Sequence, residues 1–146
     1  MPAVDTLVFP SKVDAWLAAI VVVAAVAALC VTGALLVSDV PSRLPLAVFL
    51  GAIGGVLPLW VMGATRYIVG PGELRIVSGP FRWRVPLSEI RAVTPTRNPL
   101  SSPALSLDRL RIEYGRGKWI MISPRDRQAF VSELRRRGAP IDEVAT

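Results

Sequence analysis

The stretch YIVGPGELRIVSGPFRWRV, residues 67–85, decides the fold of the second half of this chain. In the runs 73–78 and 81–85, apolar side chains alternate with polar or charged ones, which is the period of a β-strand that buries one face. Glycines and prolines at 70–72 and 79–80 separate the runs, and these residues favour tight turns. The stretch therefore predicts three consecutive antiparallel strands.

Three more strands are expected downstream. The runs 90–94, 108–114 and 118–123 have the same period, and the two glycines that flank Arg116 favour a hairpin between the last two runs. A loop separates the first two runs, because the prolines of segment 95–103 have no N–H to donate to a sheet ladder. Six strands are thus predicted in all.

A helix is expected to follow the last strand. Ser123 is suited to its N-cap, Pro124 to its first position and Asp126 to a returning hydrogen bond, and Gly138 is suited to its end. An apolar stripe occurs at helical spacing: Phe130, Val131 and Leu134. Because an antiparallel sheet buries one face only if another layer covers it, this helix is predicted to cap the β domain.

Two uncharged apolar stretches, residues 16–37 and 44–63, occupy most of the first half. At about 1.5 Å per residue, each helix would be about 30 Å long, which matches the hydrocarbon core of a bilayer. Pro41 in the short segment 38–43 is suited to a turn between them. The sequence thus predicts a transmembrane helical hairpin after an N-terminal segment, 1–15. A cleaved signal peptide is the alternative for the first stretch, but its length and the second stretch that follows at once disfavour it.

Charge is distributed unevenly between the two halves. Residues 1–65 carry two basic and three acidic side chains, whereas the later residues carry 15 basic and eight acidic ones. The positive-inside rule therefore places the basic half in the cytoplasm, and two spans return the N-terminus to the same side. The predicted location is the bacterial cytoplasmic (inner) membrane with both termini cytoplasmic, and Trp16, Trp60 and Tyr67 are expected as aromatic anchors at its interface.

Glycines in the second apolar stretch have two interpretations. Gly51 and Gly55 form a G-x-x-x-G pattern, which permits close approach of two helices. The pattern either mediates homodimerisation or packs against the alanine-rich first stretch, and we favour the second interpretation because a hairpin must bury its own seam. Pro58 predicts a kink in the same stretch. The sequence leaves the oligomeric state open.

Several motifs are shared with one known family. They are FPSKVDAW at 9–16, SGPF at 78–81, NPLSSPALSLDRL at 98–110, ISP at 122–124, and Phe130. On these segments the chain resembles, over almost its full length, the bacterial PH-like family typified by YyaB-like PH domain proteins. The resemblance implies a pleckstrin-homology-like, partly open antiparallel barrel over residues 66–138 with a C-terminal capping helix, followed by a tail, 139–146. It implies no reaction, because this fold carries ligand binders and scaffolds alike.

The serine-rich motif between the fourth and fifth predicted strands raises the question of catalysis. A serine nucleophile needs a base within hydrogen-bond reach, but the chain has no histidine and neither a G-x-S-x-G nor an S-x-x-K pattern. We therefore interpret the motif as a structural loop whose polar side chains bind backbone groups that lack ladder partners, with catalysis as the alternative. Its residues are Asn98, Pro99, Ser101, Ser102, Pro103, Ser106, Asp108 and Arg109.

Arginines form the remaining candidate site. Arg75, Arg82 and Arg84 occupy alternate positions on two adjacent predicted strands and are expected to share one exposed face. Guanidinium groups so arranged bind phosphate or anionic head groups. The alternative is a solvated strand face without a ligand.

The function predicted from the sequence is that of a membrane-anchored PH-like binding or scaffolding module without catalytic activity. Exposed sheet edges favour a protein partner, and a reader of anionic lipid head groups at the inner leaflet is the alternative. Dispersed basic residues beside a membrane disfavour nucleic acid as a partner. No cofactor or metal is predicted, because the chain has no histidine and a single cysteine, Cys30.

Overall fold

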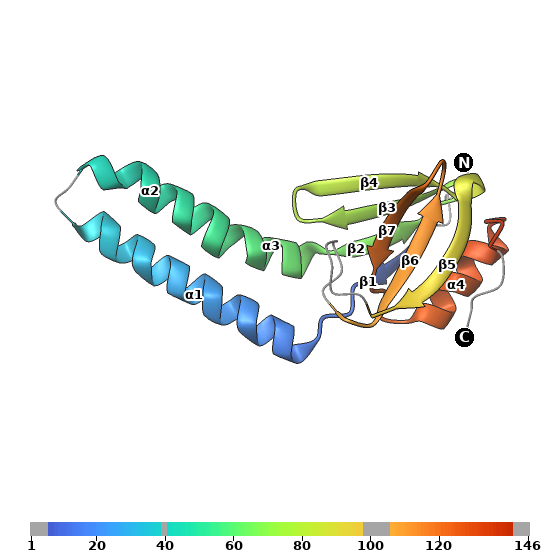
Figure 1. The fold of residues 1–146 in the computed structure, drawn as a ribbon, viewed down its shortest axis with the longest axis horizontal. Helices are drawn as coiled ribbons and strands as arrows, with labels where there is room; N and C mark the ends of the chain where they lie inside the picture. Colours follow the sequence, from blue (N-terminus) through green and yellow to red (C-terminus); the bar gives the residue numbers. More distant parts are fainter. Residues whose placement is uncertain (1–5, 39–40, 98–105, 142–146) are drawn as a thin grey trace.

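The computed structural model describes residues 6–38, 41–97 and 106–141. A long helical hairpin extends from one end of a β domain (Figure 1). The first arm is α1, Ala15–Val37, and the elements of the second arm are η1 (Pro41–Arg43), α2 (Leu44–Phe49), η2 (Leu50–Val56) and α3 (Leu57–Ala64). Both arms are long and apolar enough to cross a membrane, as predicted, and only 6% and 17% of their apolar windows are buried, so the β domain does not cover them.

Small residues let the two arms pack closely. A Cβ atom on Gly54 would lie 3.0 Å from the Cβ of Ala28, and one on Gly51 would lie 3.1 Å from the Cγ2 of Thr32. Gly51 and Gly55 are both buried against α1. The interpretation in which these glycines seal the seam of the hairpin is therefore confirmed.

The middle of the second arm, η2, consists of wide π-helical turns. Its last turn closes with a hydrogen bond from the N–H of Leu57 to the carbonyl of Ala52, five residues back. The next residue is Pro58, which has no N–H to continue the four-residue ladder. A kink was predicted at Pro58, whereas the structure shows π turns on the N-terminal side of this proline.

Over the described residues, the β domain contains two antiparallel sheets and one α-helix. The first sheet has the order β1-β2-β3-β4 and the second has the order β5-β6-β7. The elements are β1 (Leu7–Pro10), β2 (Arg66–Val69), β3 (Glu73–Ser78), β4 (Phe81–Pro86), η3 (Leu87–Glu89), β5 (Ile90–Thr96), β6 (Arg109–Tyr114), β7 (Lys118–Ile122) and α4 (Arg127–Arg136). The six predicted strands are confirmed, and the sheets do not close into one barrel.

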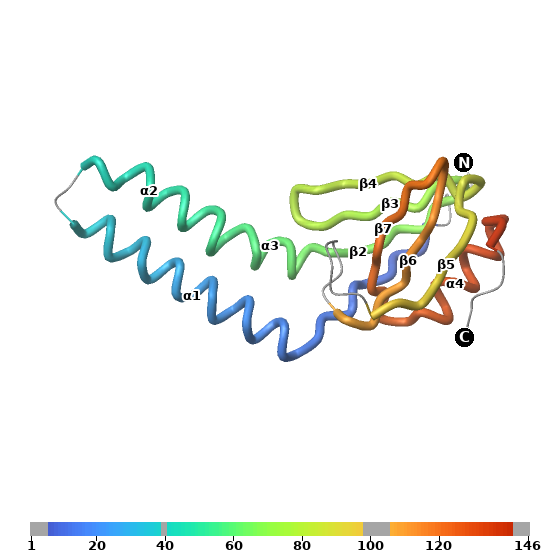
Figure 2. The backbone as a smooth tube through the Cα atoms, in the orientation of Figure 1, coloured from blue at the N-terminus to red at the C-terminus, as the bar shows by residue number. Residues whose placement is uncertain are grey.

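Strand β1 was not expected from the sequence, and it changes the description of the hairpin. Pro10, its last residue, pairs with Arg66, the first residue of β2. The hairpin is therefore an insertion between two neighbouring strands, and both arms leave the first sheet side by side (Figure 2). The N-terminal segment belongs to the β domain instead of standing apart from it.

One hydrophobic core lies between the two sheets and α4. Its largest fully buried side chains come from β2–β7, η3 and α4: Tyr67, Val69, Leu74, Ile76, Val85, Leu87, Ile90, Leu110, Ile112, Ile122, Phe130 and Leu134. The ring of Phe130 meets that of Phe9 edge-on at a centroid distance of 5.3 Å, so α4 also covers β1. The predicted apolar stripe of α4 is confirmed, with Val131 partly buried beside Phe130.

The start of α4 differs from the prediction. Its N-cap is Asp126, whose side chain accepts a hydrogen bond of 2.9 Å from the N–H of Ala129. Ser123 does not cap the helix, because its hydroxyl is turned toward the hydroxyl of Ser11 at 3.2 Å. Its carbonyl accepts a hydrogen bond of 2.7 Å from the N–H of Lys12. The chain after β7 first runs beside the end of β1 and only then turns into the helix.

Candidate functional site

The segment between β1 and α1, residues 11–14, is here named the connector, and the family motifs converge on it. The ammonium group of Lys12 lies 3.0 Å from one carboxylate oxygen of Asp108, just before β6. The guanidinium group of Arg127, at the start of α4, lies 2.7 Å from the other oxygen. Asp108 therefore joins the connector to both the second sheet and the capping helix.

Asp14 ties the connector to the same loop. Its carboxylate accepts hydrogen bonds from the N–H of Leu107 at 2.9 Å and from the hydroxyl of Ser106 at 2.8 Å. These two bonds lower the pKa of Asp14 below 3.8 because they stabilise the charged form, and the bond from the N–H of Leu107 has the larger effect. Asp14 is the N-cap residue of α1, but its side chain makes no capping hydrogen bond, since it binds the loop before β6 instead.

A buried hydroxyl cluster completes these contacts. The hydroxyl of Tyr67 accepts a hydrogen bond of 3.0 Å from the N–H of Ser123 and lies 3.1 Å from the hydroxyl of Ser11. Tyr67 and Ser123 are fully buried. The expectation that Tyr67 is an anchor at the membrane interface is therefore wrong, because its ring fills the core and its hydroxyl holds the connector.

The structure places only part of the predicted serine-rich loop. Ser106 and Asp108 contact the connector, and the buried Arg109 donates a hydrogen bond of 2.6 Å from its Nε to the carbonyl of Ser106. The other candidates lie outside the described residues: Asn98, Pro99, Ser101, Ser102 and Pro103.

The three predicted arginines do lie on one face of the first sheet. Arg75 on β3 pairs in register with Arg84 on β4, and Arg82 lies opposite Val77. Arg66 on β2 also lies opposite Val77, so it joins this outer face, and it was not in the predicted set. We name Arg66, Arg75, Arg82 and Arg84 the arginine face, and it borders a shallow cavity of about 230 Å³. Within the described part of the chain, Arg75 is the only one of the four with an acidic partner, Glu73.

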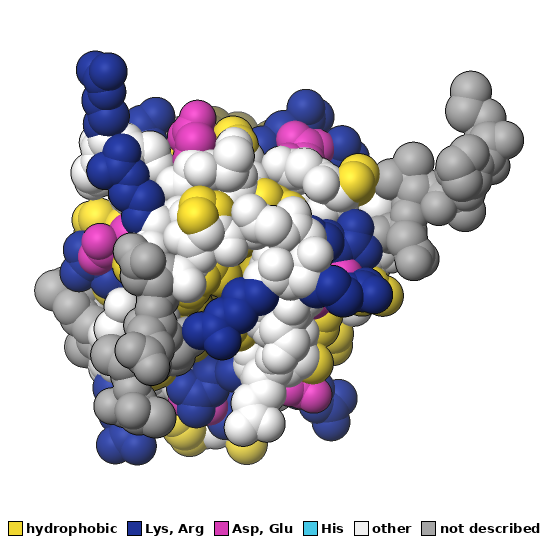
Figure 3. All heavy atoms as spheres, turned by 90° about the vertical axis from the view of Figure 1, so that its right-hand side faces the viewer, with side chains coloured by type: hydrophobic (Ala, Val, Ile, Leu, Met, Phe, Trp, Pro, Cys, Tyr) yellow, Lys and Arg dark blue, Asp and Glu magenta, His cyan; other side chains and the backbone are white. Residues whose placement is uncertain are grey.

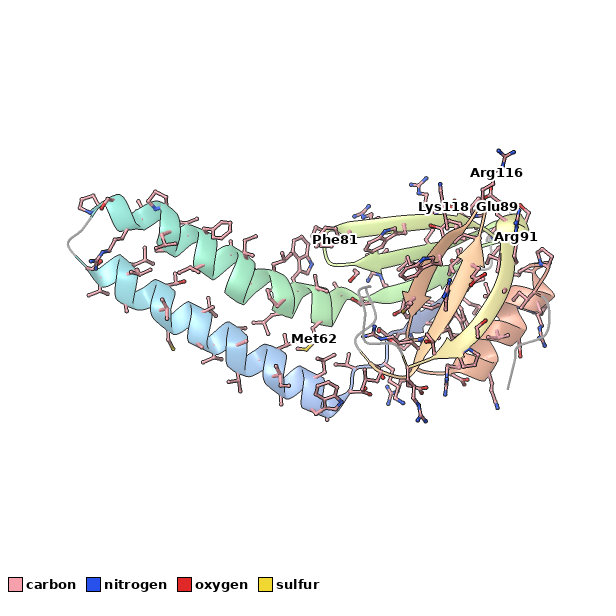
Figure 4. The ribbon with its side chains drawn as sticks, in the orientation of Figure 1. Met62, Phe81, Glu89, Arg91, Arg116 and Lys118 are labelled. Carbon is pink, nitrogen blue, oxygen red and sulfur yellow. The ribbon has the colours of Figure 1, made fainter. Side chains whose placement is uncertain are left out.

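The arginine face adjoins the helical hairpin at one end. Arg66 follows α3 directly, and a Cβ atom on Gly79, in the β3–β4 turn, would lie 2.9 Å from Val61 of α3. Phe81, half exposed, lies at this end of the β domain, whereas Arg116 lies at the opposite end (Figure 4). Arg66 and Arg82 are therefore the members of the face nearest to the hairpin.

A second and larger hollow lies between the end of β5 and α4. It is an open groove of about 790 Å³. The residues that form its walls are Pro95 and Arg97 from β5 and its C-terminal end, and Gln128, Val131, Ser132 and Arg135 from α4. Asp108 and Arg127 border the same groove, so the ion pair that holds the connector also forms part of its edge.

Two antiparallel sheets, a C-terminal helix that covers their core, and hollows on a sheet face and beside the helix define a PH-like module. The family model described as Bacterial PH domain matches residues 65–138, which is half of the chain. The chain belongs to the bacterial PH domain family. The match begins after the hairpin, so β1 lies outside it. Comparisons with curated proteins and with solved structures gave no match.

Proposed function

We propose that this protein is a membrane-anchored PH-like module that binds a partner protein in the groove between β5 and α4. The observation that carries the proposal is the groove itself, an open hollow of about 790 Å³ with apolar and charged walls. PH-like folds commonly serve as binding or scaffolding modules, and a groove beside a sheet end and a helix suits a peptide segment.

Three features support anchoring in a membrane with the β domain on the cytoplasmic side. The two arms are apolar, and the protein itself buries almost none of their surface, as is typical of helices that face lipid. The pairing of Pro10 with Arg66 requires both arms to end on the same side of the bilayer. The basic residues are concentrated in the β domain, which the positive-inside rule assigns to the cytoplasm of a bacterial cell.

A topology reporter tests the anchoring separately from the binding. The reporter is one that is active only in the cytoplasm, and it is fused after residue 146 of the full chain. We expect this fusion to be active. Activity of an exported reporter at that point would overturn the proposed orientation. For either orientation in the membrane, the functional unit includes residues 7–10 together with 66–138, because β1 completes the first sheet.

Site-specific photocrosslinking tests the proposed groove. A photoreactive amino acid at Gln128, an exposed wall residue, is expected to give a reproducible adduct with one membrane or cytoplasmic protein in native cells. The same amino acid at Arg116, at the far end of the domain, is the matched control. Filling the groove with Ser132→Trp should abolish the adduct. No adduct at Gln128, or one that survives Ser132→Trp, would refute the proposal.

Binding of anionic lipid head groups by the arginine face is the second candidate function. The observation that favours it is the position of Arg66 and Arg82 at the end of the sheet that adjoins the hairpin, where head groups would lie. Full-length protein in nanodiscs that contain anionic lipid is expected to retain that lipid after detergent extraction, and R66Q/R82Q to retain less. Equal retention by R66Q/R82Q and by the control R116Q would exclude this candidate.

A further inference from the structure

The groove between β5 and α4 carries an excess of positive charge. Arg97 and Arg135 stand on its two walls, and Arg127 stands at its edge. The one acidic residue in the lining, Asp108, already contacts Arg127 at 2.7 Å and Lys12 at 3.0 Å. Its negative charge is therefore compensated, and among the residues that the structure describes neither Arg97 nor Arg135 has an acidic partner.

The face of α4 that borders the groove determines how many residues of an extended ligand can contact it. Residues 127, 128, 131, 132 and 135 lie on one side of the helix, over about two turns and roughly 12 Å. An extended peptide covers this distance with about four residues. Val131 lies between the polar members of this row, so an apolar side chain of the ligand has a contact in the centre of the groove.

Strand β5, which borders the groove, is poorly suited to non-specific pairing with another strand. Pro95, at the groove end of β5, has no N–H to donate to an added strand. Selection of a ligand falls to the side chains of the groove, and these carry positive charge.

Basic side chains cover the end of the β domain that is turned away from the hairpin. In the space-filling view of this end, Lys and Arg side chains are more extensive than Asp and Glu side chains, and hydrophobic side chains are visible between them (Figure 3). Arg116 lies at this end, so the R116Q control described below separates its general charge from the charge of the groove.

We propose that the groove binds an extended acidic segment of a partner protein, with an apolar residue over Val131 and carboxylates that pair with Arg97 and Arg135. This inference rests on the proposed function and names the chemistry of the partner. Guanidinium groups suit carboxylates because they present a planar fork of donors. Arg127 is assigned to the connector, since it is already paired with Asp108.

Peptide binding to the full chain in nanodiscs of zwitterionic lipid tests the inference. The probe is a fluorescein-labelled peptide of sequence Glu-Glu-Leu-Glu-Glu, and its matched controls replace every Glu by Gln or by Lys. The acidic peptide is expected to raise the fluorescence anisotropy at concentrations at least tenfold lower than either control does, and its binding should weaken as salt is added. Equal binding of the Gln peptide would overturn the proposal.

Variants locate the binding to the groove. R97Q/R135Q is expected to weaken binding of the acidic peptide about tenfold or more, whereas R116Q removes a charge far from the groove and should leave binding within about twofold. An equal effect of R116Q would show a diffuse charge effect and overturn the proposal. If the Gln128 adduct forms normally in R97Q/R135Q, the acidic inference is wrong but the proposed function stands. If no adduct forms in any variant, the proposed function itself is wrong.

Discussion

Removal of one hydroxyl group, by Tyr67→Phe, tests whether the connector is held to the β domain as described. The phenol oxygen accepts a hydrogen bond of 3.0 Å from the N–H of Ser123, and both residues are fully buried. Phenylalanine keeps the ring in the core but leaves this N–H without its acceptor. An unsatisfied buried donor costs about 1–3 kcal/mol of unfolding free energy. For a domain of this size, each kcal/mol lowers Tm by roughly 4–8 °C.

The assay is thermal unfolding of the full chain in nanodiscs, followed by tryptophan fluorescence. Tyr114→Phe is the matched control, because Tyr114 is only partly buried and its hydroxyl forms no hydrogen bond with another residue that the structure describes. The control should change the unfolding free energy by less than about 0.5 kcal/mol. Hydrogen exchange gives a second measurement: the amides of Lys12 and Ser123 should exchange faster in Tyr67→Phe. If the two variants unfold at the same temperature, the reasoning about the hydroxyl cluster is refuted.

Three further predictions concern the seam, the connector and the core. Gly54→Leu should destabilise the hairpin by about 1–3 kcal/mol in a detergent-unfolding titration, because a Cβ atom at position 54 would lie 3.0 Å from the Cβ of Ala28. The control Gly33→Leu should not destabilise the hairpin, because there is open space at its Cβ. Equal effects of the two variants would contradict the described seam. The carboxylate of Asp14 should stabilise the fold above pH 3.8 and lose this effect as the pH falls through its lowered pKa, so wild type and Asp14→Asn should converge in acid-unfolding curves; a constant difference would count against it. Phe130→Ala should cost about 3–5 kcal/mol in denaturant unfolding, and a loss under about 1 kcal/mol would be incompatible with its place in the core.

Strands β2–β7 were predictable because each is a local pattern of alternating side chains between turns. Strand β1 was not, since Leu7–Pro10 is short and its pairing partner follows only after the whole hairpin. No local signal links two strands across such an insertion. Pro10 also lowers the strand propensity of this short run, although proline is tolerated in an edge strand such as β1.

The candidate sites were predictable to different degrees. The shared face of Arg75, Arg82 and Arg84 followed from strand period alone, and the structure brings them together. Arg66 was missed because the end of α3 and the start of β2 could not be separated to one residue. The signal for the connector was present in the motifs at 9–16 and 98–110, but spacing in sequence does not reveal which motifs touch.

The groove was beyond the reach of sequence reasoning. Its walls come from elements that are about 30 residues apart in the chain, residues 95–97 and 127–135, and their approach depends on how α4 crosses the second sheet. The predicted helix start at Ser123 was also three residues too early, because the observed N-cap is Asp126.

The insertion of the hairpin between β1 and β2 has a consequence for biosynthesis. A ribosome makes β1 first, yet β1 has nothing to pair with until residue 66 has been translated and both arms have come to rest. The first sheet thus stays one strand short until the whole hairpin has folded, and a chain whose arms end apart from each other never completes it. In such a chain the edge of β2 would stay unpaired, and an unpaired edge favours aggregation.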